Sequence, residues 1–266
     1  MNEDLRKVQL IEKDVLDAIV TICNKYNLTY YLSCGTLLGA IRHKGYIPWD
    51  DDLDLFMFRN DLNRFCEVAP QEIGDDYFVQ FQGTEPNCFE DLVKVRKTGT
   101  RYADVWSVRC NYSNYGCWVD IYPVDGIKGI NSFQFKFQRI IGKKVIHRIC
   151  NYRSLKNLEG LPISKKIIHY LSCIFPLNVW SSLRTKIYTL GKTDTEYVTE
   201  FTGDYSWNKL TFPRSVFGEP VKVEFEGGEY NAPKEYKKVL EITYGDYMQL
   251  PPPEKRVNHM PPNYEL

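Results

Sequence analysis

Four aspartates stand at the entrance to an apolar segment, and this feature most limits what the chain can fold into. The segment reads Trp49-Asp50-Asp51-Asp52-Leu53-Asp54-Leu55-Phe56-Met57-Phe58. On an extended backbone, Asp52 and Asp54 share one face while Leu53 and Leu55 point into a core. Carboxylates this close repel each other, and a hard cation such as Mg²⁺ is a suitable counter-ion for oxygen ligands. The tract therefore predicts a strand over residues 52–58 with a cation bound at its entrance.

Charge is distributed unevenly along the chain. The sequence has 34 basic and 34 acidic residues, yet residues 128–192 hold 13 Lys and Arg against the single acid Glu159. This asymmetry predicts a basic face opposite an acidic, metal-binding one. The basic face is either simply solvated or contacts anionic lipid headgroups or an anionic glycan. No RNA- or DNA-binding module motif is present, so we expect no nucleic-acid partner.

Composition and cysteine spacing indicate a soluble protein of a reducing compartment. Hydrophobic residues make up 43% and charged residues 26% of the chain. The eight cysteines form no CxxC pair, which favours free thiols and argues against a structural zinc site. No secretion signal follows Met1, and the apolar stretch 167–180 is broken by Pro176 and too short to span a bilayer. We expect a cytoplasmic protein, with a position at the inner membrane face left open.

Hydrophobic periodicity predicts an α/β protein. Helices are expected over residues 8–22, 36–42, 133–151, 165–190 and 234–242, with one more starting near residue 61. Strands are expected over 28–32, 52–58, 77–81, 92–97, 118–122 and 221–225, and the proline-rich stretch 251–262 predicts an extended arm. We divide the chain into a catalytic core (1–130), a basic helical insertion (131–195) and a C-terminal segment that packs on the core (196–266).

Three blocks of sequence carry a family resemblance. The first is Ser33-Cys34-Gly35-Thr36-Leu37-Leu38-Gly39-Ala40-Ile41-Arg42-His43-Lys44-Gly45-Tyr46-Ile47-Pro48 continuing into the aspartate tract, the second is Gly116 to Asp125, and the third is Tyr244 to Pro252 with Arg256 and His259. Together they closely resemble the signature of the LicD family, the bacterial phosphocholine transferases related to fukutin. The resemblance covers residues 1–125 and about 220–260, and leaves the basic middle poorly matched.

The resemblance implies a nucleotidyltransferase-like mixed β-sheet flanked by helices, here with a helical basic insertion. In that fold a small-residue turn precedes a carboxylate pair, and a third carboxylate follows on a later strand. Carried onto this chain, the turn is Gly35 and Thr36, the pair is Asp52 and Asp54, and the third carboxylate is Asp120. The chain has Cys34 where the family turn commonly has a glycine.

The implied chemistry is phosphoryl transfer assisted by Mg²⁺ or Mn²⁺. Asp52, Asp54 and Asp120 are the expected catalytic and metal-binding residues, with Asp50 as a further ligand and Asp120 accepting the proton of the attacking hydroxyl. The expected products of CDP-choline and a cell-surface glycan (teichoic acid, lipopolysaccharide or a lipid-linked precursor) are a phosphocholine-substituted sugar and CMP. The candidate phosphate-binding residues are Gly35, Thr36, Arg42, Lys44, Lys94 and Arg96. The trimethylammonium group requires aromatic neighbours, for which the candidates are Tyr46, Trp49, Trp106, Trp118, Tyr122 and Tyr244.

Other interpretations stay open. The same apparatus suits another CDP-alcohol, such as CDP-ribitol or CDP-glycerol, or the transfer of a nucleotide. A non-catalytic binding module on the same fold is a second alternative, although three clustered carboxylates without a metal would destabilise the fold. An acidic run alone is also typical of a loop cap or a calcium-binding turn. His43 and His259 are more simply structural histidines.

Overall fold

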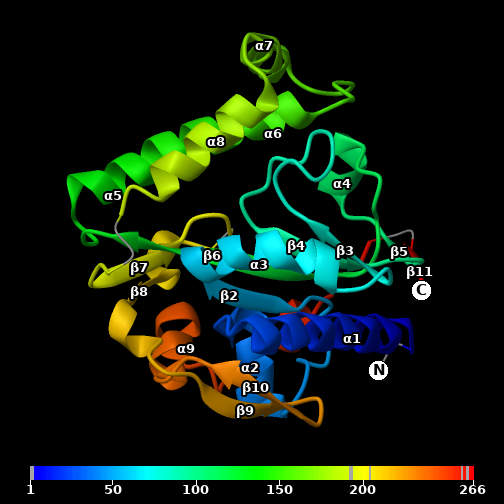
Figure 1. Cartoon of the computed structure of the whole chain (residues 1–266), viewed down its shortest axis with the longest axis vertical. Helices are drawn as coiled ribbons and strands as arrows, with labels where there is room; N and C mark the ends of the chain where they lie inside the picture. Colours follow the sequence, from blue (N-terminus) through cyan, green and yellow to red (C-terminus); the bar gives the residue numbers. More distant parts are fainter. Residues whose placement is uncertain (1–2, 192–193, 204, 259, 262–263) are drawn as a thin grey trace.

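A mixed β-sheet forms the centre of the protein in the computed structural model of the chain (Figure 1). The structure describes residues 3–191, 194–203, 205–258, 260–261 and 264–266. Five strands lie in the order β1 (Tyr30–Leu32), β2 (Asp54–Phe58), β6 (Trp118–Ile127), β4 (Val93–Lys97) and β3 (Tyr77–Gln80). β2 and β6 are parallel, whereas the other neighbours are antiparallel. Beyond its contact with β4, β6 pairs with β7 (Tyr197–Glu200), and β7 pairs with β8 (Thr211–Pro213).

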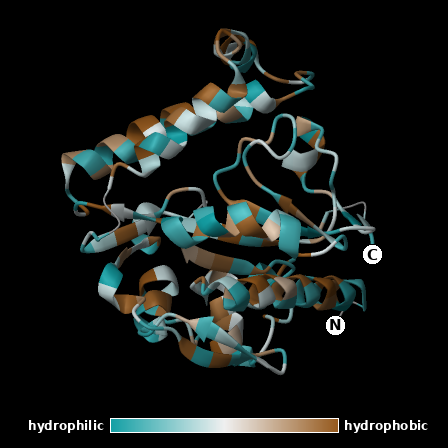
Figure 2. Ribbon diagram, viewed as in Figure 1, coloured by the Kyte–Doolittle hydropathy of each residue, from teal (hydrophilic) through white to brown (hydrophobic). Residues whose placement is uncertain are grey.

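Helices flank this sheet, which confirms the predicted α/β class. α1 (Glu3–Tyr26) and α3 (Arg59–Glu72) pack on the sheet, and α1 buries Val8, Val15 and Ile19 completely. α2 (Cys34–His43) packs with α9 (Tyr236–Tyr244) and with the hairpin of β9 (Val221–Phe225) and β10 (Gly228–Ala232). Figure 2 shows the apolar ribbon of β2 between these layers. The predicted helices at 8–22, 36–42 and 234–242 are confirmed.

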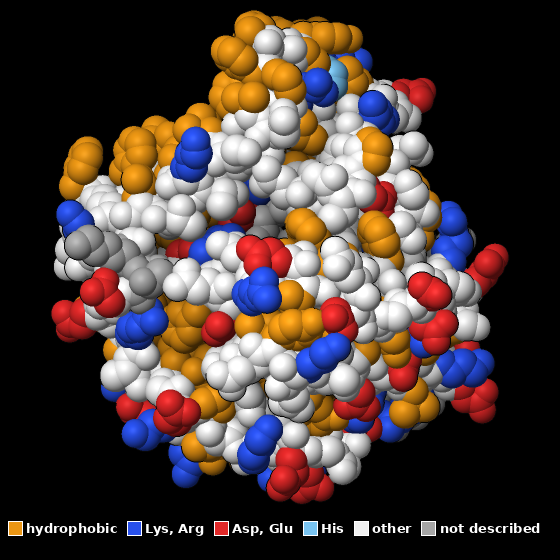
Figure 3. Space-filling view, viewed as in Figure 1, with side chains coloured by type: hydrophobic (Ala, Val, Ile, Leu, Met, Phe, Trp, Pro, Cys, Tyr) orange, Lys and Arg blue, Asp and Glu red, His pale blue; other side chains and the backbone are white. Residues whose placement is uncertain are grey.

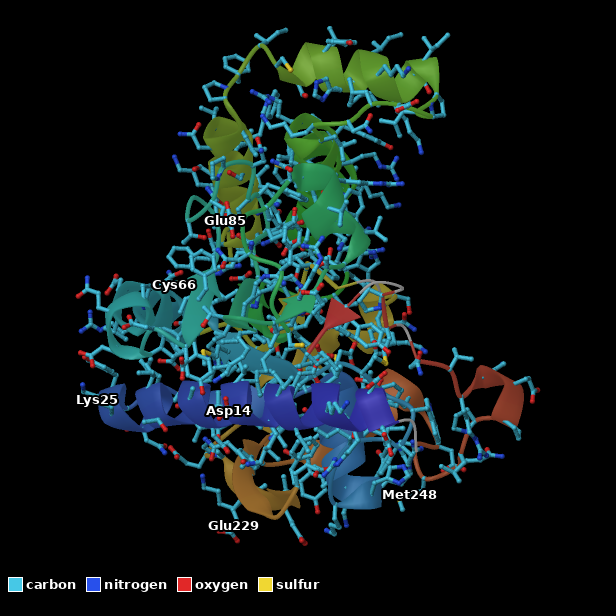
Figure 4. The ribbon with its side chains drawn as sticks, turned by 90° about the vertical axis from the view of Figure 1, so that its right-hand side faces the viewer. Asp14, Lys25, Cys66, Glu85, Glu229 and Met248 are labelled. Atoms are coloured by element: carbon cyan, nitrogen blue, oxygen red, sulfur yellow. The ribbon has the colours of Figure 1, made fainter. Side chains whose placement is uncertain are left out.

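The basic middle of the chain is helical, as predicted, and joins β6 to β7. It consists of α5 (Phe133–Phe137), a π-helix (Gln138–His147), α6 (Arg148–Ser154), α7 (Ile163–Ser172) and α8 (Leu177–Tyr188). Figure 4, turned by 90°, shows these helices rising from the sheet, with α7 across the top. The single helix predicted over 165–190 is two helices, because Pro176 fixes an extended backbone at the N-cap of α8.

Several short elements had no sequence prediction. α4 (Val105–Cys110) follows β5 (Arg101–Tyr102), and β5 pairs with β11 (Tyr264–Glu265), so the C-terminal segment returns to the core. Short 3₁₀ turns span Trp207–Lys209, Arg214–Val216 and Pro253–Lys255. The last of these interrupts the predicted extended arm over 251–262, within which His259 lies outside the described residues.

Two further features concern long apolar helices and the cysteines. Among the described residues, no helix combines the length and the apolar character that crossing a bilayer requires. All eight cysteines fall within the described ranges, and each is a free thiol.

Candidate active site

The predicted carboxylates meet where β2 and β6 begin. Asp54 is the first residue of β2 and lies directly beside Asp120 of β6 in the parallel register. The Asp120 N–H also donates to the Leu53 carbonyl at 2.9 Å, which fixes the two strand entrances together. Asp54 and Asp120 are buried. Asp50, Asp52 and Asp54 line one cavity of about 580 Å³, which we call the acidic cavity.

The carboxylates of the acidic cavity repel one another. Burial, followed by repulsion from Asp52 and Asp51, raises the pKa of Asp50 to about 8. Burial raises the pKa of Asp54 well above its usual range, and Asp52, Asp120 and Asp50 add to the rise. Buried like charges favour the protonated form unless a cation joins them. The acidic cavity is therefore a place where a bound cation would relieve repulsion.

Asp120 is held by two neighbours. Lys94 Nζ lies 2.8 Å from Asp120 Oδ1, and Trp118 Nε1 donates to Asp120 Oδ2 at 2.9 Å. Burial alone lowers the pKa of Lys94, but the nearby carboxylates of Asp120, Glu90 and Asp104 outweigh it, and the net shift is upward. Lys94 thus stays cationic and keeps Asp120 oriented.

The small-residue turn lies directly against the acidic tract. Cys34 begins α2 with a φ of 46°, in the left-handed region where a glycine is less strained, which accounts for the glycine common at this position. Thr36 Oγ1 accepts from the Asp54 N–H at 2.8 Å and thereby ties the turn to β2. A Cβ on Gly35 would lie 2.6 Å from Asp50 Oδ2, so only glycine allows this approach.

α1 packs against the acidic tract and contacts it through polar side chains, a role that the sequence did not predict. Gln9 Nε2 donates to the Asp50 carbonyl at 2.9 Å, and the buried Glu12 adds another carboxyl group nearby. Burial, with repulsion from Asp52 and Asp51, raises the pKa of Glu12 well above its usual range. The signal in the sequence is two polar residues that interrupt the apolar face of the opening helix.

Aromatic side chains form part of the wall of the acidic cavity. Three of the predicted candidates, Trp49, Tyr122 and Tyr244, line it. Sequence reasoning missed Tyr205, whose hydroxyl lies 3.3 Å from that of Tyr244. It also missed Glu200, a buried residue of β7 that lines the cavity and accepts from the Gly203 N–H at 2.7 Å.

The other three aromatic candidates lie elsewhere. Tyr46 is buried against Phe225, with ring centroids 5.0 Å apart. Trp106 is 40% exposed on α4. Trp118 packs under Lys94 and donates to Asp120. We therefore no longer assign these three rings to the binding of the headgroup.

The cationic residues predicted to bind phosphate lie in different parts of the structure. Arg42 lines a second cavity of about 530 Å³, which shares Trp49 and Tyr244 with the acidic cavity, and Arg256 lines it too, 5.3 Å from the Trp49 ring. Lys44 is exposed at the C-cap of α2 and lines neither cavity.

Arg96 is an internal residue. Its guanidinium is buried and donates to Gln80 at 2.8 Å, to the Gly116 carbonyl at 3.0 Å and to Ser107 at 3.1 Å. With these bonds made inside the protein, Arg96 supports the sheet, and we no longer assign it to phosphate.

The oxygen atoms of the aspartates are chemically suitable ligands for a hard divalent cation. Throughout the part of the chain that the structure describes, no group of three or more His, Cys, Asp or Glu side chains is already gathered as a metal centre. Asp50, Asp52 and Asp54 nevertheless offer oxygen ligands in one cavity, two of them with raised pKa values, behind a glycine that leaves room for them. Each oxygen of Asp120 accepts one hydrogen bond, from Lys94 and from Trp118, and a carboxylate oxygen can accept a second. Asp120 is outside the lining of the acidic cavity and adjoins it through Asp54.

Several known proteins are similar to this chain in sequence. The sequence model for the nucleotidyltransferase domain of LicD/FKTN/FKRP matches residues 27–147. The lipopolysaccharide cholinephosphotransferase LicD of Haemophilus influenzae is 31% identical over 96% of this chain and 95% of its own length. The human ribitol 5-phosphate transferase FKRP is 29% identical over 33% of this chain and 18% of its own length. An uncharacterized Rickettsia typhi protein is 46% identical over 19% of this chain and 16% of its own length. Because the similarity to the Haemophilus protein extends over nearly the whole of both chains, this protein belongs to the LicD family.

Proposed function

We propose that this protein transfers phosphocholine from CDP-choline to a hydroxyl of a cell-surface glycan, such as lipopolysaccharide, teichoic acid or a lipid-linked precursor, and releases CMP. The observation that carries the proposal is the acidic cavity, which combines three aspartates with an aromatic wall. The full-length similarity to a lipopolysaccharide cholinephosphotransferase supports the choice of transferred group. Carboxylates suit a metal-bound diphosphate, and aromatic rings suit a quaternary ammonium.

Asp50, Asp52 and Asp54 would hold Mg²⁺ or Mn²⁺, which when bound would neutralise charge on the diphosphate oxygens. Asp120 accepts the proton of the attacking glycan hydroxyl, and Lys94 and Trp118 hold its carboxylate in a fixed orientation. The new bond joins the glycan oxygen to the β-phosphorus, and the bond from that phosphorus to the CMP oxygen breaks. Arg42 and Arg256, which line the adjoining cavity, would contact the nucleotide phosphates.

The aromatic wall would receive the trimethylammonium group. Tyr122, Tyr205, Tyr244 and Glu200 line the same cavity. A quaternary ammonium donates no ordinary hydrogen bond, so ring faces and a nearby carboxylate are its natural neighbours. We therefore propose Tyr205 and Glu200 as headgroup contacts in addition to Trp49, Tyr122 and Tyr244.

The test is CMP release from CDP-choline in the presence of Mg²⁺ and a lipopolysaccharide acceptor. Asp52→Ala should abolish release while circular dichroism and the unfolding midpoint stay near those of the wild type. The matched control is Asp76→Ala, since the Asp76 side chain is 80% exposed and away from the acidic cavity. Undiminished CMP release by Asp52→Ala would refute the metal-site assignment.

The partial similarity to a ribitol 5-phosphate transferase suggests another CDP-alcohol as an alternative donor substrate. If CMP appears with CDP-ribitol or CDP-glycerol but not with CDP-choline, the active site is the same and the transferred group differs. If calorimetry detects no binding of any of these donors with Mg²⁺ present, the protein is a non-catalytic module of the family.

A further inference from the structure

Helix α7 presents an apolar stripe to solvent. Ile163 is 77% exposed, Ile167 51% and Ile174, just past the helix end, 70%, and Tyr170 and Leu171 complete the stripe. These positions recur at helical spacing, so they form one continuous face. An isolated exposed apolar residue is common on any protein, whereas a contiguous patch indicates an interaction surface.

The neighbouring helices extend this apolar surface. On α5 and the π-helix the exposed residues are Phe133, Phe137 and Ile140, and on α8 they are Val179 and Leu183. Figure 3 shows hydrophobic side chains gathered over α7 at the top of the molecule and along the outer edge formed by α5 and α8. We call the exposed apolar residues of α5, the π-helix, α7 and α8, together with Ile174, the insertion face.

Basic residues accompany the insertion face with almost no acids. Between residues 128 and 192 Glu159 is the sole acidic residue. The exposed basic residues of these helices include Lys136, Lys144, Arg148, Lys165 and Lys186. Exposed apolar side chains interspersed with Lys and Arg are typical of helices that lie in the interface of an anionic membrane.

A cavity within the insertion face adds a second observation. It has a volume of about 360 Å³ and lies between the π-helix, α6, α7 and α8. Its lining is apolar apart from Ser172 and two cations, Lys144 and Arg148. An apolar cavity with a cationic rim suits a hydrocarbon chain that carries an anionic headgroup.

We propose that the insertion face docks on an anionic lipid bilayer, with the stripe of α7 at the level of the headgroups and acyl chains. A second copy of this chain would set one basic surface against another, and nucleic acid would leave the aliphatic side chains unmatched. The π-helix also contacts a segment beside the acidic cavity, because Lys143 Nζ donates to the carbonyls of Thr202 and of Gly203, which lines that cavity. This docking is independent of the donor named above, so it can be tested without activity.

The experiment measures cosedimentation of the whole chain with vesicles of phosphatidylglycerol mixed with phosphatidylcholine, and with vesicles of phosphatidylcholine alone. The wild type should bind the anionic vesicles at least about tenfold better, and rising salt should weaken binding. Ile167→Asp combined with Ile174→Asp should reduce binding at least about tenfold. Leu10→Asp is the matched control, since Leu10 is 52% exposed on α1, and it should bind as the wild type does.

A charge variant, Lys165→Glu with Lys166→Glu, separates electrostatic attraction from apolar insertion. It should lose its preference for anionic vesicles, while its circular dichroism spectrum and unfolding midpoint remain those of the wild type. The proposal is overturned if the wild type sediments with neither vesicle. It is equally overturned if the isoleucine variant binds normally, or if light scattering shows a stable dimer that this variant dissociates.

Discussion

Trp49 and Trp106 are the same residue type, and the sequence offered both as headgroup contacts, but only Trp49 lines the acidic cavity. Motif proximity predicted that the aspartates of the tract and Asp120 lie near each other, and the parallel register sets Asp120 directly beside Asp54. It could not predict Glu12, Glu200 or Tyr205. These residues come from distant segments, and tertiary packing alone brings them to the site.

The aromatic wall leads to a prediction at one residue. Tyr244→Leu keeps an apolar side chain but removes the ring face, so KM for CDP-choline should rise about 2- to 30-fold, the range of a cation–π contact. Trp106→Leu is the control and should leave KM unchanged, because Trp106 lies on α4. Steady-state CMP release measures both. Equal effects of the two substitutions would contradict the assignment of the wall.

His147 leads to a prediction about pH. Burial, together with the nearby cations Arg184 and Lys143, lowers the pKa of His147 well below its usual value. The unfolded chain then binds more protons below pH 6.5 than the folded chain, so folding stability falls as pH falls. The expected loss is about 1.4 kcal/mol per pH unit below about pH 6.5. Urea unfolding between pH 5 and pH 8 should show a smaller loss in His147→Phe, and an unchanged pH dependence would contradict this account.

A network of buried charges joins three elements of the fold. Arg59, at the start of α3, contacts Asp125 of β6 at 2.6 Å and Asp91 at 2.7 Å. Asp91 also lies 3.7 Å from the buried Arg184 of α8 and accepts from the Thr185 hydroxyl. These arginines lower the pKa of Asp91 despite its burial, so the carboxylate stays ionised. Asp91 thereby links the sheet to the helical insertion.

Asp91→Asn should therefore destabilise the protein strongly. It leaves two buried guanidinium groups short of a counter-charge, and the expected loss is about 3–5 kcal/mol. The measurement is urea unfolding at pH 7, and Asp76→Asn, at an exposed ion pair of 3.8 Å, should cost less than about 1 kcal/mol. A similar small cost for both variants would mean that Asp91 does not connect the elements energetically.

Element boundaries show what local sequence can and cannot specify. Helical periodicity predicted the insertion, and Pro176 marked the break between α7 and α8 although we expected one helix there. The strands β7 and β8 were not predicted, because each is short and β7 takes its place from β6, a strand about 70 residues earlier in the sequence. β6 continues beyond β4 and offers β7 an edge, and β8 then pairs with β7.

At the scale of the whole molecule, the insertion and the core share their apolar clusters. Phe135 and Tyr188 of the insertion pack with Phe201 beyond β7, and the Tyr188 and Phe201 rings stack 4.6 Å apart. A second cluster unites Phe89 of the core with Ile146 of the π-helix. The sequence division at residues 131 and 195 therefore follows a change of composition and secondary structure, but the packing continues across it.

This shared packing predicts that the chain unfolds as one cooperative unit. Differential scanning calorimetry should give a single transition, with the calorimetric and van 't Hoff enthalpies equal, because two apolar clusters contain side chains from both the insertion and the core. Ile146→Ala removes a buried side chain from the shared cluster and should lower the midpoint while keeping one transition. Val105→Ala, at a residue 63% exposed on α4, should leave the midpoint unchanged. Two resolved transitions, with only one of them shifted by Ile146→Ala, would instead show that the insertion folds independently of the sheet that carries the acidic cavity.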